Sequence, residues 1–202
     1  MPRRYAEIAF TPDVQALQEA HGSRRSYARR AAGDNETLGP DERRFIESRD
    51  SFYLATVNVD GWPYIQHRGG PAGFLHVLDE RTFAFADFSA NKQYVSVGNL
   101  AGDDRTALFL MDYPSQTRLK IFARARTVER ADDPALIERV VVPGYGARVE
   151  RAVVFTLEGF DWNCPQHITP RYTAADIAEA VAPLRERIAE LERELAAARG
   201  SH

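Results

Sequence analysis

The clearest pattern in the sequence is an alternation of hydrophobic and polar residues that starts at Phe52. The alternation over residues 52–59 has a period of two, which is typical of a β-strand with one buried face. Asp60 and Gly61 follow, and this dipeptide favours a tight hairpin because glycine readily adopts the positive φ that the turn needs. Pro63 then stands at the entry of a second strand. Together these features predict an antiparallel β-hairpin.

Short strands of the same kind are expected farther along the chain. Turn residues separate them, and this spacing favours an antiparallel barrel or sandwich over a βαβ fold. The sequence holds no glycine-rich dinucleotide motif and no phosphate-loop lysine motif. The predicted fold class is therefore mainly β (α+β). The expected strands after the first are residues 64–67, 76–78, 82–86, 106–111, 118–128 and 151–157.

Helices are expected before the strands. Residues 1–40 form an N-terminal helical segment, in which Pro12 can start one helix and residues 24–32 form another. Pro40 starts a third helix, with acidic residues in its first turn. The second helix carries four arginines, which form either a solvated face or a phosphate contact. These are Arg24, Arg25, Arg29 and Arg30.

The last part of the chain has a helical period. Hydrophobic residues recur at intervals of four and three, which predicts an amphipathic helix over residues 174–199. Such a stripe suits either a seam between two chains or a helix docked on the barrel. Pro183 lies inside the pattern, so the helix is expected to kink or restart there. The stripe consists of Ile177, Val181, Leu184, Ile188, Leu191 and Leu195.

Composition narrows the class of protein. A chain of 202 residues with 44% hydrophobic residues is long enough for one well-buried core. The formal net charge of -3 gives no reason to expect binding to nucleic acid or to an acidic membrane surface. Cys164 is the single cysteine, which excludes an intrachain disulfide, and no apolar run reaches the length of a membrane span. A cytoplasmic protein is the expectation.

The best local signal for an anion site is the sequence Ser89-Ala90-Asn91-Lys92. Ser89 or Asn91 is expected to cap a helix through Val97, leaving backbone N–H groups that face a phosphate. Lys92 would add a full positive charge. The alternative is an ordinary capped helix with an exposed lysine.

Two neighbouring segments carry further cations. Arg68 precedes a glycine-rich loop, and Gln66 and His67 just before it are expected to point to opposite sides of their strand. The strand over residues 118–128 places four cations on one face, which need solvent, acidic neighbours or a bound anion. They are Arg118, Lys120, Arg124 and Arg126.

A cluster of unusual residues follows the last expected strand. Trp162 offers stacking area for a lid, while His167 and Arg171 offer hydrogen-bond donors. Cys164 and His167 have the spacing of half a metal site, but no second cysteine pair completes it. No metal is therefore expected, and nothing nearby supports Cys164 as a nucleophile.

In the order of these parts, the chain resembles the pyridoxamine 5'-phosphate oxidase-like, FMN-binding split-barrel family. The resemblance covers residues 41–171 and includes the Asp60–Pro63 turn, the strand into Arg68, Phe83-Ala84-Phe85-Ala86, Asn91-Lys92 and the basic strand. It implies a six-stranded antiparallel split β-barrel with flanking helices. The expected domains are an N-terminal helical segment (1–40), a split barrel (41–173) and a C-terminal helix (174–199).

The resemblance also implies a homodimer that binds FMN in clefts between its subunits. Gln66, His67 and Arg68 would lie along the ring or ribityl chain of FMN. Phe85 and Ala86 would lie beside it, with Asn91 and Lys92 at the phosphate. The residues that would reach the flavin from the partner subunit are Arg118, Trp162 and Arg171.

Departures from the family pattern indicate a divergent branch rather than pyridoxamine phosphate oxidase itself. Asn91 stands where the oxidases carry arginine, and their Arg-x-His motif is not reproduced near Trp162. The leading expectation is an FMN-dependent oxidoreductase that transfers hydride between the flavin and a small organic substrate or reduced nicotinamide, with no catalytic residue identified. The alternatives are a non-catalytic flavin, deazaflavin or haem binder, with His67, His76 or His167 as haem ligand, and a dimeric scaffold.

Overall fold

The computed structural model describes residues 5–30, 36–163 and 165–200. The chain contains two compact units, one of residues 1–112 and 117–165 and the other of residues 113–116 and 166–202. In the first unit the helices are α1 (Tyr5–Ala9), α2 (Pro12–Ala20), α3 (Arg24–Arg30), α4 (Pro40–Glu47), α5 (Val95–Gly102) and α6 (Pro134–Val140). The strands are β1 (Ser51–Val57), β2 (Pro63–Gly69), β3 (Leu75–Val77), β4 (Thr82–Phe88), β5 (Arg105–Asp112), β6 (Thr117–Glu129) and β7 (Val149–Asn163).

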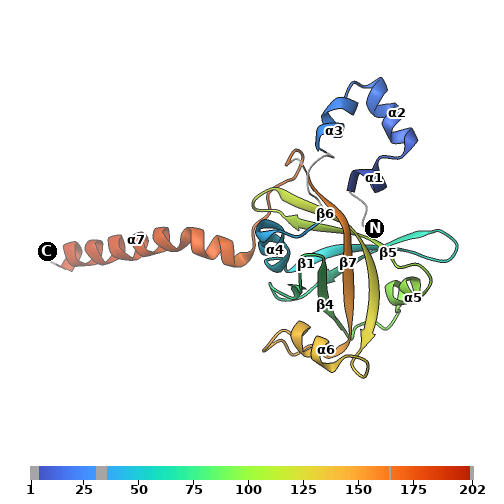
Figure 1. Ribbon diagram of the computed structural model, residues 1–202. Coiled ribbons are helices and arrows are strands. Elements are labelled where there is room, and N and C mark those ends of the chain that lie inside the picture. The colour runs from blue at the N-terminus through green and yellow to red at the C-terminus, as the bar shows by residue number, and fades with distance from the viewer. Residues whose placement is uncertain (1–4, 31–35, 164, 201–202) are drawn as a thin grey trace. The chain divides into compact units, whose positions relative to one another are not determined.

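The strands form one antiparallel sheet in the order β2-β1-β5-β6-β7-β4-β3. The mainly β class with flanking helices is confirmed, but the sheet has seven strands rather than six. The sequence pattern predicted a strand at each of these seven places, whereas the family resemblance implied six. The shortest is β3, which has three residues and pairs with β4 at the edge of the sheet. The long strands β6 and β7 run side by side through the middle of the sheet (Figure 1).

Irregularities in strand pairing account for the lengths of the central strands. β7 covers 15 residues, about twice the predicted strand over residues 151–157. A register shift between Phe122 and Ala123 interrupts its pairing with β6. Such bulges bend strands and increase their twist, so one long strand can follow a curved sheet. The sequence pattern predicted only residues 151–157 of β7.

The main hydrophobic core consists largely of aromatic rings. Phe83 stacks on Phe155 with ring centroids 4.9 Å apart, and Phe52 meets Phe85 edge to face at 5.4 Å. All four side chains are almost fully buried. Because each ring buries a large apolar area, this cluster provides much of the driving force for folding of the barrel.

A second core lies where α6 packs on β4 and β7. Ala84 and Ala86 of β4 are fully buried here, together with Ile137 and Val140 of α6. The small alanine side chains allow the helix to approach the sheet closely. Asp133 caps α6 by accepting a hydrogen bond from the Leu136 amide at 2.9 Å.

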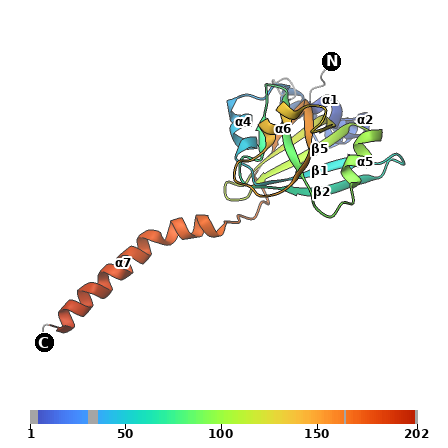
Figure 2. The same cartoon turned by 90° about the horizontal axis from the view of Figure 1, so that it is seen from below.

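The second unit contains the C-terminal helix α7 (Ala174–Gly200), which includes Pro183 and is continuous. Figure 2 shows α7 as one bent helix, so the predicted kink is compatible with an unbroken element. Thr173 and Asp176 cap its start reciprocally: the Asp176 amide donates to Thr173 Oγ1 and the Thr173 amide donates to Asp176 Oδ2. Among the described residues, none of the helices combines the length and hydrophobicity of a membrane span.

Candidate ligand pocket

A small pocket opens where β2, the end of β4, the loop 89–94 and the start of α5 meet. Its volume is only about 40 Å³. Four of the predicted site residues line it, namely Gln66, Arg68, Asn91 and Lys92. The pocket is largely polar in character, because it also includes Asp87 and Glu150 beside the aromatic rings of Tyr64 and Tyr94.

The loop before α5 differs from the predicted capped helix. The helix begins only at Val95, and its N-cap is Tyr94, whose side chain makes no capping hydrogen bond. Asn91 Oδ1 instead accepts a hydrogen bond from the Gln93 amide at 3.2 Å. The prediction that Ser89 or Asn91 caps this helix is therefore wrong.

Backbone conformation explains that difference. Lys92 has φ 57° and Tyr94 has φ 54°, both in the left-handed region that residues with a side chain rarely adopt. Two left-handed residues so close together cannot belong to a right-handed helix. They hold the loop open ahead of α5 and place Lys92, which is exposed, on the wall of the pocket.

The alternation of β2 sorts the residues Gln66, His67 and Arg68. Gln66 and Arg68 line the pocket, whereas His67 lies on the opposite face of the strand, with its ring 5.7 Å from that of Tyr53. The prediction that Gln66 and His67 point to opposite sides of their strand is thus confirmed. Ser96 Oγ donates a hydrogen bond to Gln66 Oε1 at 2.9 Å, which fixes Gln66 against the first turn of α5.

A buried ion pair forms the floor of the pocket. Arg68 Nη1 lies 2.9 Å from Asp87 Oδ1, and the two side chains are only 16% and 7% exposed. Burial raises the pKa of the Asp87 carboxyl, against the opposing effect of Arg68 and Arg151. The Arg68 Nε atom is buried and has no hydrogen-bond partner within the described part of the chain. A buried N–H without a partner is costly, and here it accompanies the Arg68–Asp87 pair.

The opposite wall of the pocket carries acidic and aromatic groups. The Tyr94 hydroxyl lies 3.4 Å from Glu150 Oε1, and the Arg151 guanidinium lies 5.4 Å from the centre of the Tyr94 ring. Arg151 also pairs with Glu129 at 3.1 Å. These contacts hold the Glu150 carboxylate and the Tyr94 ring beside Arg151.

A further contact positions α5 against the sheet. Asn99 Nδ2 donates to Thr56 Oγ1 at 2.9 Å, and Thr56 is almost fully buried. The hydrogen bond from Ser96 to Gln66 makes a second tie one turn earlier. Two hydrogen bonds therefore hold α5 against β1 and β2 beside the pocket.

The other predicted site residues lie outside this pocket. Phe85 and Ala86 are 2% and 0% exposed and pack in the two hydrophobic cores. Trp162 Nε1 donates to Glu42 Oε1 at 2.7 Å, and its ring meets Phe45 edge to face. Their predicted contacts with a cofactor stay predictions.

Arg118 and Arg171 are not among the residues that line the pocket. Arg118 is on β6, with its guanidinium 6.0 Å from the centre of the Phe109 ring. Arg171 belongs to the second unit, where it lies 4.8 Å from the ring centre of Tyr113. Cys164 falls outside the described residues, and among those that are described no group of three metal-binding side chains could hold an ion.

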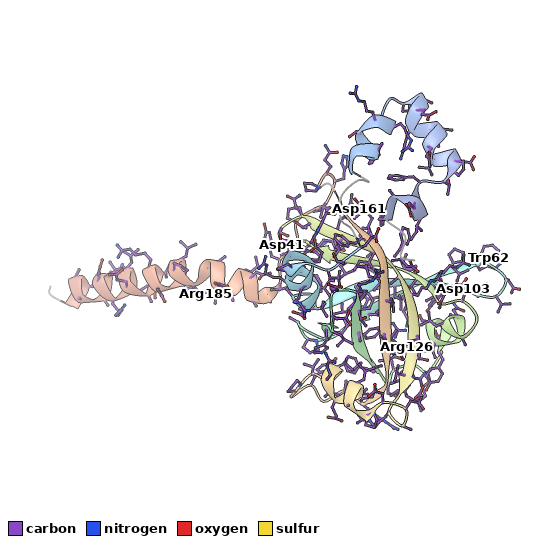
Figure 3. The ribbon with its side chains drawn as sticks, in the orientation of Figure 1. Asp41, Trp62, Asp103, Arg126, Asp161 and Arg185 are labelled. Atoms are coloured by element: carbon purple, nitrogen blue, oxygen red, sulfur yellow. The ribbon has the colours of Figure 1, made fainter. Side chains whose placement is uncertain are left out.

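The four cations of the basic strand were expected to need solvent, acidic neighbours or a bound anion. Two of them have acidic neighbours. Lys120 pairs with Asp161 of β7 at 2.7 Å. Arg124 pairs with Asp104 at 2.6 Å and with Glu158 at 2.7 Å. Figure 3 labels Asp161 and Arg126 at opposite ends of the β6–β7 ribbon. The strand therefore does not present a continuous basic surface.

The sequence interpretation missed several pocket residues. Asp87 is the clearest case, because a carboxylate inside the apolar run of β4 is a visible exception to its pattern. Tyr94 and Glu150 carried no comparable signal, since only the folded chain brings the start of β7 to the loop before α5.

The comparisons with known proteins concern mainly the barrel. Among solved structures, HupZ of Group A Streptococcus is 12% identical and matches 67% of this chain and 100% of its own, with a TM-score of 0.51. An FMN-binding protein from Syntrophomonas wolfei is 14% identical and matches 74% of this chain and 97% of its own, with a TM-score of 0.45. A protein from Lactobacillus delbrueckii, described as a candidate pyridoxamine 5'-phosphate oxidase, is 23% identical and matches 63% and 96%, with a TM-score of 0.48.

The likeness to HupZ bears on the fold alone, and no curated protein matches the sequence. The sequence profile of the family described as pyridoxamine 5'-phosphate oxidase matches residues 38–161, which is more than half of the chain and includes every residue that lines the pocket. The chain belongs to the pyridoxamine 5'-phosphate oxidase family.

Proposed function

We propose that this protein binds FMN, with the phosphate in the pocket beside Lys92 and Arg68. The observation that carries the proposal is the meeting of two cations with the start of α5 in one pocket. Helix N-termini favour anions because their first N–H groups point outward and the helix dipole adds positive charge. Gln66 and Asn91 add polar side chains to the same pocket.

The residues that line the pocket fit the phosphate of FMN better than its isoalloxazine ring. A volume of about 40 Å³ suits a group the size of a phosphate, and the donors Gln66, Asn91 and Lys92 surround it. The isoalloxazine ring would extend beyond this pocket along β2. When bound, FMN supplies a ring that accepts or donates hydride, while the protein binds its phosphate and orients one ring face.

The proposal includes a homodimer in which a second copy covers the ring. The β1–β2 hairpin supports this part, because Val59, Trp62 and Ile65 are 92%, 72% and 64% exposed. Figure 3 labels Trp62 at the end of this hairpin. Exposed apolar side chains so close together are typical of a surface that another protein chain covers.

We further propose that the bound flavin transfers hydride to or from a small organic substrate or a reduced nicotinamide. A protein that holds flavin without turnover is the alternative. The acids of the pocket favour neither role, because Asp87 is paired with Arg68 and Glu150 lies beside Tyr94 and Arg151. Steady-state reduction of the loaded flavin by a reduced nicotinamide would separate the two roles after binding has been measured.

The test of binding compares FMN with riboflavin, which lacks the phosphate. Replacement of Lys92 by alanine should weaken FMN binding by about ten- to a hundredfold, since a charge-assisted hydrogen bond contributes roughly 1.5–3 kcal/mol. Riboflavin binding should change little. Fluorescence titration measures both affinities, and Arg130→Ala serves as a control because this exposed arginine lies outside the pocket. The proposal fails if FMN neither colours the purified protein nor raises its melting temperature.

A further inference from the structure

The C-terminal helix presents a hydrophobic stripe to solvent. The helix has 27 residues, and five large apolar side chains along one face are about half exposed or more. Helices in proteins gain most of their stability from packing of such a face, so a stripe of this length calls for a partner. The exposed fractions are 50% for Ile177, 64% for Leu184, 56% for Ile188, 46% for Leu191 and 52% for Leu195.

The order of residue types along the stripe selects the kind of partner. In a heptad abcdefg, Val181, Ile188 and Leu195 take position a. Ile177, Leu184 and Leu191 take position d. β-Branched residues at a with leucine at d favour two parallel strands, and two of the three residues at each position follow this rule. Pro183 takes position c, on the side away from the stripe.

The charges that flank the stripe agree with a parallel arrangement. In a parallel, in-register pair, position g of one helix meets position e of the next heptad on the other. Arg187 then faces Glu192 of the second copy, and Glu194 faces Arg199 of the second copy. Both contacts join opposite charges, and both occur twice in a symmetric pair.

The antiparallel arrangement is less favourable. The register that keeps every apolar layer of the stripe pairs position g with g and e with e, which places Arg187 beside Arg187 and Arg185 beside Arg185 of the other copy. Like charges at such short distance repel one another. Charge complementarity therefore distinguishes the two orientations.

We propose that α7 pairs with α7 of a second copy of this chain as a parallel, in-register, two-stranded coiled coil. The proposal does not depend on flavin binding. A coiled coil would also raise the effective concentration of one barrel near the other, so the two barrels would stay together at low protein concentration.

Disulfide trapping in the full-length chain tests the orientation. The chain has one cysteine, so Cys164→Ser gives a background without thiols. Leu191→Cys in this background should form a covalent dimer on mild oxidation, because a parallel pair brings position 191 opposite itself. The matched control is Ala189→Cys, at position b on the outer face, which should remain monomeric on a non-reducing gel. Antiparallel packing would separate the two 191 positions by about 15 Å.

Charge reversal provides the second measurement. Arg187→Glu alone and Glu192→Arg alone each place like charges across the pair and should shift the dimer towards monomer in sedimentation experiments. The double variant restores an opposite pair between chains and should recover the dimer. Equal trapping at positions 189 and 191, no trapping at 191, or a double variant no better than the single variants would each overturn the proposal.

Discussion

At the scale of single residues, the Arg68–Asp87 pair determines the character of the ligand pocket. The two side chains meet at 2.9 Å and are largely buried, and burial raises the pKa of Asp87 although two arginines are near. Desolvation therefore outweighs the attraction of the arginines. A buried pair of this kind contributes little net stability, but it fixes the position of the Arg68 side chain, which lines the pocket.

Replacement of Asp87 by alanine should destabilise the protein by about 3–5 kcal/mol, because Arg68 would remain buried without its counter-ion. The double variant Asp87→Ala with Arg68→Met should recover a large part of that loss, since no uncompensated charge remains. Chemical denaturation of the wild-type protein, Asp87→Ala, Arg68→Met and the double variant completes a double-mutant cycle. If the stability lost in the double variant equals the sum of the losses in the two single variants, Arg68 and Asp87 are not energetically coupled.

The residue scale also shows what alternation can predict. The period of two correctly separated Gln66 from His67, because side chains on a strand must alternate between its faces. The left-handed conformations of Lys92 and Tyr94 were beyond such reasoning. Neither residue type favours a positive φ, so only tertiary contacts can impose one.

At the scale of elements, the turn after β2 depends on the absence of a side chain at Gly70. A Cβ atom built on Gly70 would lie 2.8 Å and 2.9 Å from Phe74 atoms, and Phe74 is a fully buried core residue. One of the contacted atoms is the Phe74 Cβ, which is fixed to the backbone. The glycine therefore allows the chain to pass closely over its own core.

Gly70→Ala should destabilise the protein by about 1–3 kcal/mol through overpacking against Phe74. Gly98→Ala is the matched substitution, because Gly98 lies inside α5 and a Cβ there would meet nothing within 4 Å. That change should stabilise the protein by up to about 1 kcal/mol, the difference in helix propensity. Thermal melts of both variants measure the two effects. A stable Gly70→Ala variant would mean that the turn relaxes freely.

Elements were predictable where one local signal controlled them. The Asp60–Gly61 hairpin, the helix that starts at Pro40 and the C-terminal helix all follow from turn residues, proline or a long period. The full length of β7 and the late start of α5 did not follow. β7 pairs with β6 on both sides of a register shift, and two left-handed residues precede α5. Neither feature has a signal in the local sequence.

At the scale of the whole molecule, the family and the barrel could be predicted from several weak sequence motifs in the right order. The set of residues that line the pocket could be identified only in the folded chain. Lys92, Gln66 and Arg68 come from two segments that the sheet and α5 bring together. The acids that neutralise the basic strand lie on β7 and before β5, so the sequence left their contribution open. Pairing between strands is the information that a single sequence lacks.

Removal of residues 174–202 should weaken self-association and leave flavin binding unchanged. The first unit has its own hydrophobic cores, and the stripe of α7 is exposed, so the melting temperature of the barrel should change by less than about 4 °C, or roughly 1 kcal/mol. FMN affinity should also remain, since every residue of the pocket precedes residue 151. Self-association should weaken, because the proposed coiled coil would be lost.

Calorimetry, flavin titration and sedimentation of the truncated protein measure the melting temperature, the FMN affinity and the self-association. A large fall in melting temperature would mean that α7 stabilises the barrel directly, and unchanged self-association would mean that the barrels alone hold two copies together.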